Sequence, residues 1–237
     1  MRLLKKQEDI FMNLLIDKLI KELKAYNTKN KSVFNPWTDF DSNCDFSSSA
    51  PKIRENNLKE YLNFLKSRRK VKLIIVAEAM GYKGGKFTGI PLTSERLLLN
   101  KHRYVKVGGF TKSNFHQTSI KSNGFSEPTS TILWDLINSN NINIDEFLLW
   151  NIFPFHPYKR YNKCSNRTPL SSEIEEGGYY LKLILKIWPQ VSIVGIGKKS
   201  QNYLTRHRIE HHQVTHPANG RKAQFVLDFQ NALLKID

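Results

Sequence analysis

Short runs of apolar residues divide this chain and indicate where strands form. Three of these runs cover residues 71–77 (VKLIIVA), 147–152 (FLLWNI) and 191–196 (VSIVGI), and a shorter one covers residues 213–215. Continuous apolar runs of this length are typical of strands that are covered on both faces, as in a parallel sheet. The pattern therefore predicts a sheet of four strands.

Apolar residues at helical spacing lie between these runs and before them. They predict helices over residues 129–138 and 174–187, and two more over residues 2–25 and 53–68. Strands that alternate with helices predict a three-layer α/β/α sandwich around a mainly parallel, four-stranded sheet. In such a fold, ligands bind at the carboxyl ends of the strands.

The first predicted helix is basic and amphipathic. Its apolar face comprises Leu4, Phe11, Leu15, Leu19 and Leu23. A helix of this kind either binds a membrane surface or packs against its own protein, and packing is the favoured interpretation.

The segment that follows, residues 27–52, is polar and is expected to be an ordered loop. Four aromatic side chains are candidates to hold it against the body of the protein: Phe34, Trp37, Phe40 and Phe46. No internal repeat or domain boundary is visible. We therefore expect a single domain over residues 1–237, in which an N-terminal helical extension (1–68) packs on the core (70–237).

The charge balance indicates the kind of partner. The chain has 37 Lys and Arg against 21 Asp and Glu, which gives a net charge of +16. Its sequence pI is about 9.8. Such a protein binds polyanions. DNA, RNA and acidic membranes all qualify, and a nucleic acid is the favoured partner.

The sequence also argues against several classes of protein. Two cysteines, Cys44 and Cys164, are too few for a disulfide framework, a four-thiolate zinc site or an iron–sulfur cluster. Charges run throughout the first 24 residues, as they do not in a signal peptide, and no segment approaches the roughly 18 apolar residues of a membrane span. We expect a cytoplasmic chain with no membrane partner and no metal, and take a monomer as the starting assumption.

Polar side chains that are able to do chemistry follow the predicted strands. Glu78 comes directly after the first run and opens a glycine-rich stretch, Asn151 lies at the end of the second run, and His216 follows the last. Each residue alone is a weak signal. In a parallel sheet, however, a carboxylate, an amide and an imidazole would meet at one edge.

Other motifs suggest chemistry but do not meet its requirements. Residues 195–200 (GIGKKS) lack the spacing of a phosphate-binding loop and are expected to form a strand-to-helix turn. The cluster of His207, His211 and His212 has no matching acid or cysteine for zinc. Cys164 has no neighbouring histidine base, which argues against a nucleophilic role. Three tryptophans lie in apolar runs and are expected in the core: Trp134, Trp150 and Trp188.

Three ordered motifs resemble those of the uracil-DNA glycosylase superfamily. The first, residues 78–95 (EAMGYKGGKFTGIPLTSE), is similar to the GEAPGY-type motif of a bacterial branch. The second comprises FPFHP (153–157) and SNRTP (165–169), and the third is the HPANG loop (216–220). The similarity covers roughly residues 70–225. It implies a monofunctional DNA glycosylase, which flips a pyrimidine-type base out of DNA and hydrolyses its N-glycosidic bond without a cofactor.

The resemblance also implies roles for individual residues. Glu78 would position water or stabilise the sugar cation, and His216 would hydrogen-bond the carbonyl of the departing base. Asn151 would read the Watson–Crick edge of the base. The base-binding set would also include Met80, Gly81 and Leu92. The DNA-binding set would be Thr93, Ser94, Arg167, Lys198, Lys199, Asn219, Gly220, Arg221 and Lys222.

The first motif departs from the family pattern at three positions. Ala77 stands where glycine is usual, Met80 replaces proline, and Leu92 replaces the phenylalanine that stacks on a flipped uracil. Loss of an aromatic platform forfeits about 1–3 kcal/mol of stacking per base. Three alternatives remain at this point: a uracil glycosylase, a glycosylase for a hypermodified base such as a modified cytosine of phage DNA, or a catalytically silent nucleic-acid-binding protein. Both base-excision repair and antiviral defence are compatible with the first two.

Overall fold

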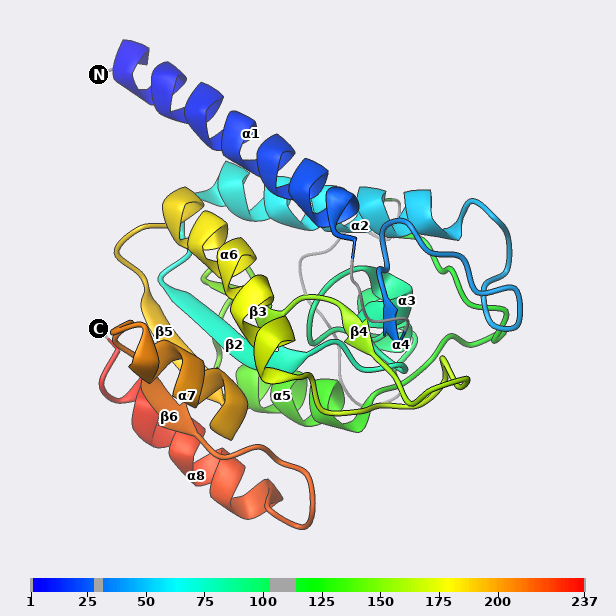
Figure 1. Ribbon diagram of the computed structural model, residues 1–237. Coiled ribbons are helices and arrows are strands. Elements are labelled where there is room, and N and C mark those ends of the chain that lie inside the picture. The colour runs from blue at the N-terminus through cyan, green and yellow to red at the C-terminus, as the bar shows by residue number, and fades with distance from the viewer. Residues whose placement is uncertain (1, 28–31, 103–113, 237) are drawn as a thin grey trace.

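A four-stranded parallel sheet forms the centre of the computed structural model, which describes residues 2–27, 32–102 and 114–236 (Figure 1). Its order is β3-β2-β5-β6, and every neighbouring pair is parallel. The strands are β2 (Leu73–Ala79), β3 (Phe147–Phe153), β5 (Ser192–Ile196) and β6 (His212–Val214). The apolar runs therefore predicted the strands, with ends that differ by one or two residues. One difference matters, because β2 runs on to Ala79 and places Glu78 inside the strand rather than after it.

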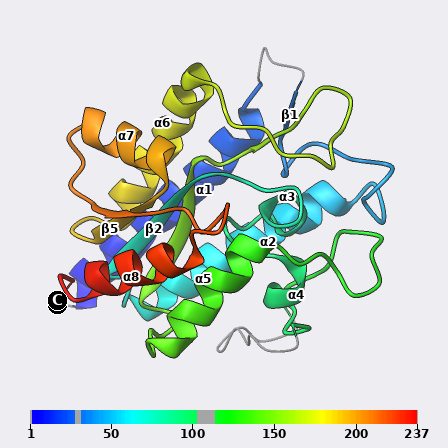
Figure 2. The same cartoon turned by 90° about the horizontal axis from the view of Figure 1, so that it is seen from below.

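Helices cover both faces of the sheet, which gives the predicted three-layer α/β/α sandwich. The helices α6 (Ser171–Ile187) and α7 (Lys198–Arg206) lie on one face. The other face carries α5 (Pro128–Ser139) and α8 (Lys222–Leu233), as Figure 2 shows. Apolar side chains between the layers are excluded from water, and this burial is the main stabilising term of such a core. Trp134, Trp150 and Trp188 are buried there, as predicted.

The N-terminal helices pack on this sandwich. Helix α1 (Arg2–Ala25) contacts α6 and α2 (Ala50–Arg68). Its C-terminal half buries Leu19 and Leu23, whereas Phe11 is 59% exposed and not on the packed face as predicted. The reason is visible in Figure 1, where the first turns of α1 extend beyond the body of the protein. The side chain of Leu4 lies outside the described residues.

The polar segment after α1 is ordered over its described part. It contains β1 (Val33–Phe34), which pairs antiparallel with β4 (His156–Pro157) and so ties the segment to the loop after β3. Phe34 and Trp37 are buried as expected, but Phe40 and Phe46 are exposed. Two ion pairs, rather than these two rings, hold this segment against the body of the protein. The pairs, both buried, are Arg54–Asp45 at 2.8 Å and Lys86–Asp41 at 2.7 Å.

Two short helices that the apolar pattern did not predict follow β2, namely α3 (Gly85–Thr88) and α4 (Glu95–Leu98). Glu95 is buried and accepts hydrogen bonds from the backbone of Thr118, Ser119 and Phe125. It therefore anchors the chain that leads to α5. Within the described part of the chain, no helix is both long and apolar enough to cross a membrane.

Candidate active site

A cleft of about 850 Å³ opens at the carboxyl edge of β2. The segments that line it come from the end of β2, the glycine-rich turn that follows it (residues 80–84), the start of α5, the loop after β4 and the loop after β6. Several of the residues predicted from the sequence line this cleft: Glu78, Met80, Gly81, Leu92, Arg167, His216, Asn219 and Arg221. Residues more than a hundred positions apart in the chain therefore share one cavity.

Glu78 supplies the carboxylate of the cleft. It is the penultimate residue of β2 and is half-buried. Burial raises the pKa of Glu78 above its usual value, and the positive charge of Lys199 at the start of α7 opposes this rise. A carboxylate that is partly withdrawn from water interacts strongly with any positive charge that develops beside it.

His216 supplies the imidazole. Its Nδ1 accepts a hydrogen bond from the backbone N–H of Ala218 at 3.1 Å. Burial, assisted by the positive charge of Arg221, lowers the pKa of His216 below its usual value. The ring is therefore neutral near pH 7 and, because Nδ1 is an acceptor, its proton is on Nε2. The geometry leaves Nε2–H as a hydrogen-bond donor.

Asn151 is near the cleft but does not line it. It lies on β3 directly opposite Ala77 of β2, and Ala77 does line the cleft. The Asn151 side chain is fully buried, and neither Nδ2 nor Oδ1 has a hydrogen-bond partner among the described residues. An unpaired buried amide costs about 1–3 kcal/mol, so native proteins retain one only for a reason. Among the described residues, this amide therefore has an unused donor and an unused acceptor, and it lies on the strand next to the one that carries Glu78.

The three base-binding candidates of the first motif form one wall of the cleft. Met80 is held from both sides, because its N–H donates to Phe155 O at 3.1 Å and its O is 2.9 Å from Nδ1 of His156. Leu92 has a left-handed backbone with φ of 53°. The indole N–H of Trp134 donates to Leu92 O at 3.2 Å and helps to hold this uncommon conformation.

The loop after β6 projects from the protein beside His216. Asn219, Gly220, Arg221 and Lys222 are all exposed, and Asn219 and Gly220 have φ of 58° and 77°. Lys222 is the first residue of α8 rather than part of the loop. At the start of α7, Lys198 is exposed and Lys199 half-buried. These positions are accessible to a DNA backbone.

Three residues of the predicted DNA-binding set are placed differently. Thr93 and Ser94 are buried, and the Thr93 hydroxyl donates to Pro91 O at 3.1 Å, so neither side chain is at the surface. Arg167 directs its guanidinium onto the Glu173 carboxylate through two bonds of 2.7 Å. Bidentate pairs of this kind use the donors that a phosphate would need. In this structure Arg167 holds its loop against α6.

The motif analysis assigned no role to several polar residues that line the cleft, namely Glu127, Thr129, Lys159, Asn166 and Thr168. Asn166 accepts a hydrogen bond from the backbone N–H of Tyr82 at 2.9 Å and so fixes the glycine-rich turn. Glu127 precedes α5 and places its carboxyl group against the same turn. Asn166 lies inside the SNRTP motif, so the sequence did offer a reason to expect it in the site. Glu127 lies outside every motif. The one sequence feature that could have drawn attention to it is its position directly before Pro128, at the start of a predicted helix.

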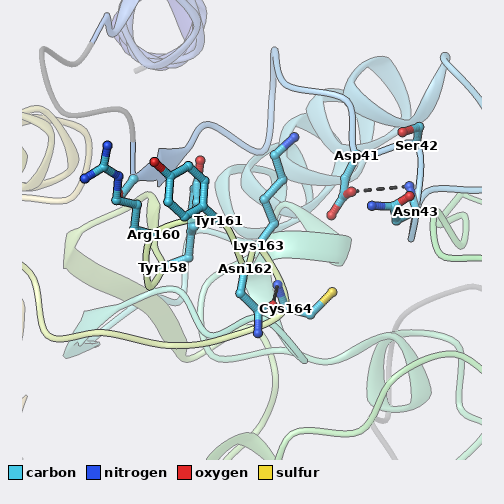
Figure 3. A pocket seen from close by; sticks show the side chains of 10 residues that line it. Asp41, Ser42, Asn43, Tyr158, Arg160, Tyr161, Asn162, Lys163 and Cys164 are labelled. Atoms are coloured by element: carbon cyan, nitrogen blue, oxygen red, sulfur yellow. Dashed lines mark hydrogen bonds between the residues drawn. The ribbon is translucent and has the colours of Figure 1, made fainter.

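A second cavity, of about 790 Å³, is lined in part by the loop after β4 (Figure 3). It is lined by Asp41–Asn43 and by the basic and aromatic residues between Tyr158 and Cys164. His156 stands at the base of this loop, with its Nε2 3.0 Å from Lys163 O. Burial lowers the pKa of His156 to about 4, so its ring is neutral. None of the residues that line this cavity is a predicted site residue.

The class of enzyme follows from the fold and a sequence comparison together. The family model described as the uracil DNA glycosylase superfamily matches residues 66–231, most of the chain. The protein is a DNA glycosylase. More specifically, it belongs to the uracil-DNA glycosylase superfamily, as its three motifs predicted. No curated protein sequence matches it.

The fold is also similar to a solved structure, that of wild-type Pedobacter heparinus SMUG2. The two chains are 19% identical, and the match has a TM-score of 0.57 and covers 93% of this chain and 97% of the other. At this level of identity the likeness is one of fold. The three-layer architecture is thus the architecture of a known structure.

Proposed function

We propose that this protein is a monofunctional DNA glycosylase that hydrolyses the N-glycosidic bond of a pyrimidine-type base flipped out of DNA. The observation that carries the proposal is that Glu78 and His216 line one cleft, with the unpaired amide of Asn151 in the neighbouring strand. A carboxylate, an imidazole donor and an amide are the groups that this reaction needs.

The proposed roles follow from how charge moves in the reaction. As the bond to the base breaks, the sugar becomes an oxocarbenium-like cation and the electron pair moves onto the base. Glu78, as a carboxylate, would stabilise the cation and orient the attacking water. His216 would donate from Nε2 to the base carbonyl as negative charge builds there, an interaction typically worth about 3–4 kcal/mol. Neither role requires a metal or an organic cofactor.

Base flipping would bring the target base into the cleft. The base must leave the stack, which costs a few kcal/mol and is offset by contacts in the pocket and to the backbone. The exposed residues Asn219 to Lys222, at the end of the loop after β6 and the start of α8, would enter the duplex, and Lys198 and Lys199 would contact phosphate. Asn151 would then pair with the Watson–Crick edge of the extruded base, once the base has reached the end of β3.

The substrate is proposed to be uracil or a pyrimidine with a substituent. The cleft of about 850 Å³, whose rim would also contact the DNA backbone, has room for a substituted base. The aliphatic Leu92 in the place of an aromatic ring also favours a base that does not depend on stacking. A substituted base would suit defence against phages with modified DNA, and uracil would suit repair in a bacterial cell.

We further propose that the chain acts as a single domain and as a cytoplasmic monomer. The contacts of α1 with α6 support the view that residues 1–68 belong to the same unit as the core 70–237. The net charge of +16 supports DNA as the partner.

The decisive experiment is base release from defined duplexes. Duplexes with one uracil, 5-hydroxymethylcytosine or glucosylated hydroxymethylcytosine are incubated with the protein, and abasic sites are revealed by alkaline strand cleavage. Glu78→Gln and His216→Ala should reduce turnover by at least about a hundredfold while DNA affinity stays within about threefold. Glu210→Gln and His116→Ala, at exposed positions outside the cleft, are the matched controls. Tight DNA binding without base release from any duplex would instead identify a silent DNA-binding protein.

A further inference from the structure

Glu127 is the second acidic side chain that lines the cleft, besides the proposed catalytic Glu78. Its carboxyl group lies against the glycine-rich turn so closely that a Cβ atom on Gly81 would collide with Oε1, and one on Gly84 with Oε2. Both positions therefore need glycine if the carboxyl group is to stay where it is. The turn and the carboxyl group form one wall of the cleft.

The carboxyl group does not cap the helix that it precedes. Glu127 is the N-cap residue of α5, but its side chain makes no hydrogen bond to the backbone of the first turn. Among the described residues, the one group that donates a hydrogen bond to it is the Ser130 hydroxyl, on Oε2. Oε1 has no donor among the described side chains and backbone groups, in a residue that lines the cleft. A purely structural role as a helix cap does not explain this arrangement.

The environment limits what Glu127 can bind. Burial raises the pKa of Glu127 above its usual value, and the hydrogen bond from Ser130 opposes the rise. A carboxyl oxygen repels phosphate, so it does not serve the DNA backbone. It accepts hydrogen bonds from O–H and N–H groups, and these bonds are strong when the acceptor is charged and the site is dry. The ligand that fits is a hydrogen-bond donor on the flipped nucleotide.

Uracil offers no hydrogen-bond donor that would need the Glu127 carboxyl group in addition to the amide of Asn151. Its Watson–Crick edge offers one N–H, and the amide oxygen of a single asparagine satisfies it while the amide N–H₂ pairs with a carbonyl. The same asparagine pairs equally well with cytosine. Asn151 is thus sufficient for the base edge, and an additional acceptor implies an additional donor elsewhere on the base.

We propose that Glu127 is a specificity-determining residue that accepts a hydrogen bond from a hydroxyl-bearing substituent on the substrate base. The substrate class is then a pyrimidine with a hydroxymethyl group or a sugar attached to it, and not bare uracil. This inference rests on the proposed glycosylase function and assigns its substrate. Gly81 and Gly84 let the carboxyl group approach the cleft, and Ser130 orients it.

The test is a specificity ratio rather than an activity. The ratio of kcat/KM for a 5-hydroxymethylcytosine duplex to that for a uracil duplex is measured for the wild type, Glu127→Gln and Glu127→Ala. Both variants should lower the ratio by about tenfold or more, since each removes the carboxyl group that would bind the substituent. Ser130→Ala should lower it less. Equal losses on both duplexes would show that Glu127 only braces the turn, and an unchanged ratio would also overturn the proposal.

A binding measurement separates this inference from the proposed reaction. In the Glu78→Gln background, which is expected to leave the base in place, the affinities for the same two duplexes are compared with and without Glu127→Gln. A preference for the hydroxymethylated duplex that disappears with Glu127→Gln supports the inference even if the wild type releases no base. No preference, or one that persists in Glu127→Gln, overturns it. Thermal unfolding of each variant reports whether the turn still folds.

Discussion

Ala77 and Asn151 face each other across the β2–β3 ladder, and through this pairing a fully buried amide lies next to a residue of the cleft. The amide has no partner among the described residues, so the fold bears the cost of burying it. If Asn151 is kept for the substrate, its replacement should affect activity and stability in opposite directions.

Asn151→Leu keeps the approximate size of the side chain and removes both unpaired polar atoms. We expect the free energy of unfolding to rise by about 1 kcal/mol and base release to fall by at least about a hundredfold. Urea denaturation and the duplex assay measure the two quantities. Asn57→Leu is the matched control, because its buried amide donates to Thr88 O and His116 O and should therefore be destabilising when lost. An Asn151→Leu protein that is less stable would contradict the interpretation.

Local sequence patterns were sufficient for the sheet and insufficient for the surface of the site. The strand runs are apolar because helices cover both faces of the sheet. The burial of Trp150 and the three-layer architecture could therefore be predicted from the pattern of apolar runs and helices. The buried state of Thr93 and the commitment of Arg167 to Glu173 depend on segments that are distant in sequence or on the path of a loop. No periodicity encodes such contacts. Glu127 was not found for the same reason, because its neighbours Gly81 and Gly84 are more than forty residues away.

The acid side of the pH–rate profile should depend on Lys199. The proposed role of Glu78 needs the carboxylate, so kcat/KM should fall as the pH drops through its pKa, which burial raises and Lys199 lowers. Lys199→Gln removes the positive charge that lowers the pKa of Glu78. The acid limb of the profile, where kcat/KM falls with decreasing pH, should therefore move to higher pH. Single-turnover base release across the acid range measures the shift. Lys198→Gln, at the exposed neighbouring position, should leave the limb in place. A limb that moves to lower pH in Lys199→Gln would contradict the assignment.

Arg221 should act on DNA affinity through charge. It is exposed and lines the cleft, and we propose that it contacts a phosphate. Arg221→Ala should weaken binding to all sequences alike and reduce the slope of log affinity against log salt by about 1. Fluorescence anisotropy at several salt concentrations gives the slope. Lys186→Ala removes a charge from an exposed position on α6 and should change the slope less. Equal slopes for Arg221→Ala and the wild type would exclude a phosphate contact.

Cys44 and Cys164 are close enough to be joined under oxidising conditions. Their Sγ atoms are 2.9 Å apart, although the residues are 120 positions apart in the sequence. Two exchange steps with glutathione disulfide would form the bond, reduce the oxidant to two glutathiones and leave the protein two hydrogens lighter. Burial raises the pKa of Cys44 to about 12, so the reaction should be slow at neutral pH.

The cross-link should stabilise the fold, because it closes a long loop in the unfolded chain, an effect of up to about 4–5 kcal/mol. Mass spectrometry and thermal unfolding before and after oxidation measure the two effects. Cys44→Ser and Cys164→Ser should show neither. A higher melting temperature in an oxidised serine variant would assign the effect to something else.

Leu92 offers a direct test of the two substrate classes. Leu92→Phe restores the aromatic ring of the family pattern at a position whose backbone, with φ of 53°, already holds a large side chain. Stacking on a flipped base is worth about 1–3 kcal/mol, so kcat/KM on uracil should rise by about tenfold. The larger ring also narrows the cleft, so activity on a glucosylated base should fall. The ratio of the two rates is the measurement, and thermal unfolding of the variant checks that the hydrogen bond from Trp134 to residue 92 still holds the turn. If both rates fall by the same factor, the ring has only disturbed this strained segment, and Leu92 does not select the base.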